Sequence, residues 1–134
     1  MTTPYTDAWL VGSSNHKFYT RTYQSTIPQK AVLVFLHGFI EHIARYEHVF
    51  PRYQARGITV FAFDQRGFGM TAEDKKERSK DAAYGKTCTA DALRDVEWAV
   101  GVAKEKADGA PVFLMGHSMV SPNSLVLLLK ASNV

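Results

Sequence analysis

A serine directly follows a run of apolar residues in the last fifth of this 134-residue sequence. The run at 111–115 leads into Gly116, His117 and Ser118, which matches the start of the G-x-S-x-G nucleophile elbow. In such an elbow a sharp strand-to-helix turn exposes the serine hydroxyl, and amide groups at the helix start face the oxyanion of acyl transfer. A Gly-x-Ser triplet alone is a weak signal, but a preceding buried strand is the context that this chemistry requires.

A second motif, His37-Gly38-Phe39, follows an earlier apolar run at 31–36. In proteins with a nucleophile elbow, the loop after the corresponding strand supplies a second oxyanion amide. A His-Gly pair at a strand end is often an ordinary turn. Here one further apolar run and two predicted helices separate it from Ser118, and this order favours a shared site.

The elements that must position these motifs can be read from the hydrophobic pattern. Strands are expected at 8–11 and 17–23, and three continuous apolar runs suit strands buried on both faces. These runs lie at 31–36, 58–63 and 111–115. Two strands followed by β-α-β-α-β predict a mostly parallel sheet with helices on its faces.

Two helices are expected between the apolar runs. The first spans about 45–56, and Pro51 predicts that it begins near this residue or is kinked there. The second spans about 89–107, where Val96, Ala103 and Ala107 recur on one face together with Leu93 and Val100. The mixed charge run at 73–81 is interpreted as a solvated loop or short surface helix.

Composition excludes several classes of protein. The net charge of +3 comes from scattered residues, so no nucleic-acid partner is expected. One cysteine, Cys88, allows no intrachain disulfide and is interpreted as an ordinary small side chain near a helix start. No signal peptide or transmembrane helix is expected. The predicted location is the cytoplasm, and peripheral contact with membranes or lipid droplets is compatible with it.

Gly67 and Gly69 fit a dinucleotide fingerprint only loosely, because the strand-to-helix context that this motif requires is missing.

Four motifs together resemble a known family. They are His-Gly-Phe-Ile-Glu-His at 37–42, Arg-Tyr at 45–46, Phe-Asp-Gln-Arg-Gly-Phe-Gly at 63–69 and Gly-His-Ser-Met at 116–119. The set is similar to the monoacylglycerol lipase group of α/β hydrolases, which belongs to the serine aminopeptidase S33 (hydrolase-4) type. The sequence motif at 63–67 resembles that of fungal members. The resemblance runs from about Trp9 to Met119 and implies the N-terminal part of the α/β-hydrolase fold.

The resemblance also implies roles. Ser118 would be the nucleophile, and the backbone amides of Phe39 and Met119 would form the oxyanion hole. The reaction would be hydrolysis of lipid monoesters through an acyl-enzyme, without cofactor or metal. The side chain of His117 is expected to point away from the elbow. The remaining matched polar residues are interpreted as structural: Glu41, Arg45, Tyr46, Asp64, Arg66, His37 and His42.

The family pattern breaks after Met119. Val120 stands where the elbow has glycine, and residues 119–134 contain no Asp, Glu or His that could complete a triad in the order Ser, acid, His. We therefore expect residues 1–119 to be hydrolase domain and 120–134 to be a non-family tail, which translated intron sequence would explain. These 134 residues alone are expected to have little activity, and the strand at 111–115 is expected to form an apolar edge prone to self-association.

Two alternatives stay open at this point. The chain could be a short non-catalytic isoform that acts as a binding or regulatory module. It could also belong to a peptidase or thioesterase of the same fold.

Overall fold

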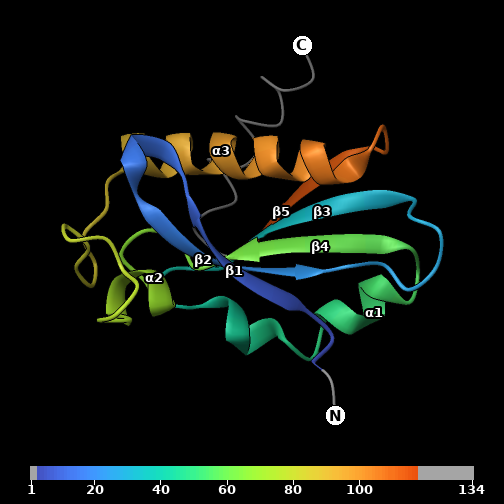
Figure 1. Ribbon diagram of the computed structural model, residues 1–134, viewed down its shortest axis with the longest axis horizontal. Coiled ribbons are helices and arrows are strands. Elements are labelled where there is room, and N and C mark those ends of the chain that lie inside the picture. Colours follow the sequence, from blue (N-terminus) through green and yellow to red (C-terminus); the bar gives the residue numbers. More distant parts are fainter. Residues whose placement is uncertain (1–2, 118–134) are drawn as a thin grey trace.

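The computed structural model describes residues 3–117, which form one five-stranded sheet with helices on both sides (Figure 1). The order of strands across the sheet is β1-β2-β4-β3-β5. The strands are β1 (Thr6–Val11), β2 (Lys17–Tyr23), β3 (Ala31–Leu36), β4 (Ile58–Phe63) and β5 (Val112–Gly116). Ser118 and Met119 lie outside the described residues.

The three apolar runs form the parallel part of the sheet, as the sequence predicts. β3 lies between β4 and β5 and pairs with both in parallel. β1 and β2 are joined by the short 3-10 turn η1 (Ser13–Asn15) and pair antiparallel, as does β2 with β4. The sheet is therefore mixed, because a tight turn can only join antiparallel strands, whereas β3, β4 and β5 are linked through helices.

Of the two predicted helices, one has the expected bounds and the other is divided into two short helices. α3 (Thr89–Ala107) has the predicted bounds. The region expected to hold one helix is divided into η2 (Ile43–Tyr46) and α1 (Phe50–Gln54), with Pro51 in the first turn of α1. Proline is tolerated there because the first amide groups of a helix have no intrahelical partner. The charge run begins at the end of a short helix, α2 (Gly69–Glu73), and continues as turns.

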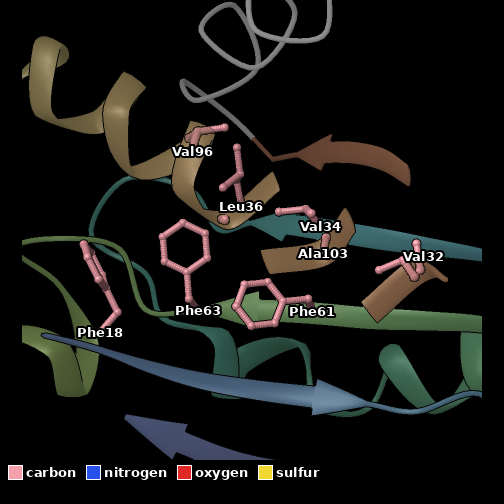
Figure 2. Packing of buried hydrophobic residues seen from close by; sticks show 10 residues of the cluster. Phe18, Val32, Val34, Leu36, Phe61, Phe63, Val96 and Ala103 are labelled. Atoms are coloured by element: carbon pink, nitrogen blue, oxygen red, sulfur yellow. The ribbon is translucent and has the colours of Figure 1, made fainter. Parts of the chain in front are cut away.

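Side chains from both faces of the sheet are buried, which explains why the central runs are apolar throughout. On one face, Phe61 and Phe63 pack with Val34 and Leu36 against α3 (Figure 2). α3 contributes the small residues Ala99, Ala103 and Ala107 together with Val96, so the helix lies close to the sheet. The sequence pattern missed Ala99 on this face and included Leu93 and Val100, which are only partly buried.

The opposite face packs against α1 and η2 through a cluster rich in aromatic residues. Its buried members are Tyr19, Tyr23, Leu33, Phe35, Ile43, Phe50, Val60 and Ala62. β5 lies at an edge of the described sheet, with Phe113 and Met115 exposed. Within residues 3–117, no helix has the length and apolar character needed to cross a bilayer.

Candidate active site

The carboxyl ends of β3 and β5 lie side by side, which brings the two sequence motifs together. Leu36 pairs with Gly116 at the end of the parallel ladder, and the His117 amide donates to the Leu36 carbonyl oxygen at 3.1 Å. The residue before Ser118 is thus placed against the start of the 37–39 loop. The roles of Ser118 and Met119 stay predictions, because both residues fall outside the described part of the chain.

His37 is buried within the scaffold of this loop. Its Nε2 accepts the Gln65 backbone N–H at 2.9 Å, so the ring proton lies on Nδ1, which donates to the Gly38 carbonyl oxygen at 2.8 Å. The Gln65 side-chain amide donates to the His37 carbonyl oxygen at 2.6 Å. Burial lowers the pKa of His37 and favours the neutral ring. With both ring nitrogens engaged, His37 supports the loop, as the sequence indicates.

Phe39 carries the amide that was predicted to face the oxyanion. The Gly38–Phe39 peptide bond is trans, so the Phe39 N–H points away from the Gly38 oxygen that His37 holds. Among residues 3–117 this N–H has no hydrogen-bond partner. The Phe39 side chain is exposed, and its ring centroid lies 5.5 Å from that of Phe68. An unoccupied donor of this kind is what an oxyanion hole requires.

Glu41 connects the loop to η2. Its Oε1 accepts the Gly38 N–H at 2.7 Å and the Tyr46 hydroxyl at 2.5 Å, while Oε2 accepts a hydrogen bond from Arg45 at 3.1 Å. The hydrogen bond from Tyr46 lowers the pKa of Glu41, and burial together with this carboxylate raises the pKa of Tyr46 to about 12. The pair therefore stays in the carboxylate and neutral phenol forms at neutral pH.

His117 joins the same cluster, which sequence reasoning did not foresee. Its Nδ1 lies 3.1 Å from the Tyr46 hydroxyl oxygen and 3.6 Å from Glu41 Oε1. Since the Tyr46 proton is donated to Glu41, the His117 ring donates to Tyr46. The residues are 71 positions apart in the sequence, so no local pattern could have revealed the contact.

Ile40 has a backbone conformation that is unusual for its type. Its φ is 59°, in the left-handed region, although it is β-branched, and the residue is 57% exposed. Non-glycine residues of this kind are true outliers that persist only where the surroundings enforce them. The strained residue lies between the Phe39 amide and Glu41.

Asp64 and Arg66 have the structural roles that the sequence indicates. The Asp64 carboxylate accepts the amides of Ile43 at 2.8 Å and Met70 at 2.9 Å. Gly69, at positive φ, lies so close to this carboxylate that any Cβ would overlap it. Packing on Asp64 thus accounts for this glycine, and the loose dinucleotide pattern needs no nucleotide.

Arg66 forms a bidentate ion pair with Asp95 of α3, at 3.0 and 2.9 Å, and also donates to the Ser13 carbonyl oxygen at 3.1 Å. Asp95, a charged residue within the buried face of α3, is not among the residues singled out from the sequence. The sequence signal that could have revealed this ion pair is the position of Asp95, an acidic residue among the apolar positions of α3.

A hollow of about 290 Å³ opens beside the 37–39 loop. Phe39 and Phe68 line one part of it, and Gln65, Cys88 and Thr89 line another. The first residues of α3 therefore border the same space as the candidate oxyanion amide.

Comparison with known proteins gives a consistent result. A family model described as "Serine aminopeptidase, S33" matches residues 27–131. The monoglyceride lipase of Homo sapiens is 31% identical over 117 residues, which cover 87% of this chain and 36% of that protein. The monoacylglycerol lipase of Mycolicibacterium smegmatis is 33% identical over 90 residues, or 67% of this chain and 29% of that protein.

A solved structure shares the fold over the same range. It is a soluble variant of the monoglyceride lipase from Saccharomyces cerevisiae in complex with a substrate analog. It superposes with a TM-score of 0.74 at 26% identity, covering 89% of this chain and 38% of the other. The chain spans 10% to 39% of the length of the curated relatives that it matches.

Proposed function

The chain belongs to the serine aminopeptidase S33 family of α/β hydrolases, and from this premise we propose that it supplies the nucleophile and the oxyanion loop of a monoacylglycerol-lipase-type ester hydrolase. The observation that carries the proposal is the pairing of Leu36 with Gly116, beside a loop whose Phe39 amide has no partner within residues 3–117. His117, the residue before the proposed nucleophile, therefore lies at the start of the loop that carries this donor.

In the proposed reaction Ser118 Oγ attacks the ester carbonyl carbon while its proton passes to a general base. The carbonyl oxygen becomes an oxyanion that accepts hydrogen bonds from the Phe39 and Met119 amides. Collapse of the intermediate expels the alcohol, which takes up the proton, and leaves an acyl-enzyme. Water, activated by the same base, then adds to the acyl carbon and releases the fatty acid and Ser118.

His37 does not fit the role of the base in this scheme. Its ring is buried and both nitrogens are hydrogen-bonded within the loop. Residues 119–134 contain no histidine or acid. In the order Ser, acid, His both partners of the nucleophile would follow it, so the proposal concerns the activity of a complete hydrolase domain that includes this chain.

A lipid monoester is the proposed substrate. The monoglyceride lipase relatives support this class. The exposed Phe39 and the Phe68 ring border the hollow beside the oxyanion loop, and such aromatic surface suits an acyl chain better than a charged substrate.

The test uses this chain within a complete hydrolase domain, with Ser118→Ala as the matched control. A fluorophosphonate probe should label the parent protein and not the variant. Among monoacylglycerols, p-nitrophenyl esters and aminoacyl amides, the monoacylglycerols should be hydrolysed with the highest kcat/KM. Preference for aminoacyl amides would favour a peptidase, and a folded domain that is not labelled would favour a non-catalytic binding role.

A further inference from the structure

We infer that Glu41 is a positioning residue that fixes the oxyanion loop relative to His117, the residue before the proposed nucleophile. This inference rests on the proposed function and deepens it. Its basis is that a single carboxylate oxygen, Glu41 Oε1, contacts groups on both sides of the site: the loop after β3 and, through Tyr46, the residue before Ser118.

On the loop side, both polar backbone groups of Gly38 are held. Its N–H donates to Glu41 Oε1 at 2.7 Å, and its carbonyl oxygen accepts from His37 Nδ1 at 2.8 Å. These contacts fix the peptide planes before and after Gly38. The direction of the Phe39 N–H follows, because it belongs to the second of these planes.

On the nucleophile side, Tyr46 relays the position of the carboxylate to His117. The Tyr46 hydroxyl donates to Glu41 and accepts from His117 Nδ1 at 3.1 Å. The Tyr46 ring is held in place by packing, with centroid distances of 4.5 Å to Phe35 and 6.3 Å to Phe50. His117 is also tied to β3 through its own backbone amide. The residue before Ser118 is thus anchored at both its backbone and its ring.

The strained residue Ile40 shows that the loop needs such an anchor. Its left-handed φ of 59° is unfavourable for a β-branched residue, and its side chain is too exposed to be held by packing. The conformation is therefore imposed by neighbours, and Glu41 is the next residue along the chain. Without the Glu41 side chain, Gly38 keeps only the contacts to its carbonyl oxygen, so the turn would be held on one side alone and the direction of the Phe39 N–H would be less firmly fixed.

The first experiment separates positioning from binding in a complete hydrolase domain that contains this chain. Glu41→Ala should lower kcat by roughly 10²–10³-fold, the loss seen when an oxyanion donor is removed, and KM should change by less than about threefold. Glu41→Gln keeps an oxygen that can accept both hydrogen bonds and should retain kcat within about tenfold of the parent. Tyr46→Phe removes the hydrogen bond to Glu41 and the link to His117 but leaves the Glu41 contact to the Gly38 amide, so its kcat should fall between those of the two Glu41 variants.

Glu47→Ala is the matched control. Glu47 lies in the same segment, its side chain is exposed, and Arg21, its partner at 3.5 Å, keeps hydrogen bonds to Tyr19 and Tyr23, so removal of Glu47 should leave kcat and KM unchanged. If Glu41→Ala raised KM at constant kcat, or if Glu41→Gln were as damaging as Glu41→Ala, the inference would be wrong.

The second experiment does not depend on catalysis. Backbone hydrogen exchange at Gly38 should accelerate at least about tenfold in Glu41→Ala and stay unchanged in Glu47→Ala, while β3 and β4 amides stay protected. If the parent protein hydrolyses esters but exchange at Gly38 is the same in Glu41→Ala as in the parent, the inference alone would be overturned. A folded parent without Ser118-dependent hydrolysis would overturn the proposed function, and with it the catalytic part of the inference. If Glu41→Ala does not fold, the kinetic constants and the hydrogen exchange at Gly38 are measured on Glu41→Gln and Tyr46→Phe instead.

Discussion

Two polar clusters lie near the carboxyl ends of the parallel strands, and they differ in burial. The Arg66–Asp95 pair is buried, with side chains 8% and 4% exposed, and it joins the end of β4 to α3 and η1. The Glu41 cluster (Glu41, Tyr46, Gly38 and His117) lies further out: the Glu41 side chain is 14% exposed and the His117 side chain 61%. One cluster connects elements of the fold, and the other connects the loop after β3 with His117 at the end of β5.

The difference indicates how each cluster acts. Two desolvated charges stabilise a fold only while both are present, because removal of one leaves the other buried and unpaired. A carboxylate nearer to water contributes less to stability, but it can still fix the direction of an amide. We therefore expect changes in the Arg66–Asp95 pair to affect folding, and changes in the Glu41 cluster to affect the geometry of the site.

The largest effect is expected for Asp95→Asn, which leaves the Arg66 guanidinium without a counter-charge. The free energy of unfolding should fall by about 3–5 kcal/mol, measured by urea denaturation. Asp91→Asn is the control, because Asp91 pairs with Arg94 at the surface of the same helix, and its unfolding midpoint should hardly change. A loss below about 1 kcal/mol for Asp95→Asn would remove the contrast between the two clusters.

The next largest effect is a loss of folding stability in acid, which comes from two buried histidines. Burial lowers the pKa of His37 and of His16 below the ordinary value of 6.5. The unfolded chain therefore takes up protons before the folded protein does. The resulting stability is complete above about pH 6.5 and is lost as the pH falls through the lower folded pKa values. Unfolding free energies measured across this range should decline with acid, and less steeply in His37→Asn and His16→Leu.

A smaller effect on stability is expected for Glu41→Gln, the matched change in the second cluster. Because the amide oxygen can accept the same hydrogen bonds, the free energy of unfolding should fall by only about 1 kcal/mol. The lowered pKa of Glu41 adds stability that is present above its ordinary value of 4.5 and lost below it. The variant should therefore lose less stability than the parent below this pH, and a loss equal to that of Asp95→Asn would contradict the comparison.

The smallest effect, of opposite sign, is expected for Ile40→Gly. Glycine adopts the left-handed conformation without strain, although it adds entropy to the unfolded chain, so the net gain should be about 0.5–1 kcal/mol. Ile27→Gly is the control, because Ile27 is also exposed but has an ordinary negative φ, and glycine there should not stabilise. Thermal unfolding of both variants would measure the strain, and destabilisation by Ile40→Gly would show that the turn stores none.

Most of the fold could be predicted because its signals are local. The bounds of β3, β4 and α3 follow from apolar runs and from a helical period, which reflect burial on both sheet faces and on one helix face. Pro51 likewise marked the start of α1. The antiparallel pairing of β2 with β4 has no such local signal, because it depends on where the chain returns to the sheet.

The candidate site divides in the same way. The sequence alone determined the motifs at 37–39 and 116–118 and the polar character of Glu41 and Tyr46, because residue types and strand-end turns are properties of short segments. Only the tertiary structure decided that Tyr46, which donates to Glu41, also meets His117, 71 positions further along the chain. The physical reason is that hydrogen bonds require atoms within about 3 Å, and only the sheet pairing brings residues so distant in the chain to that separation.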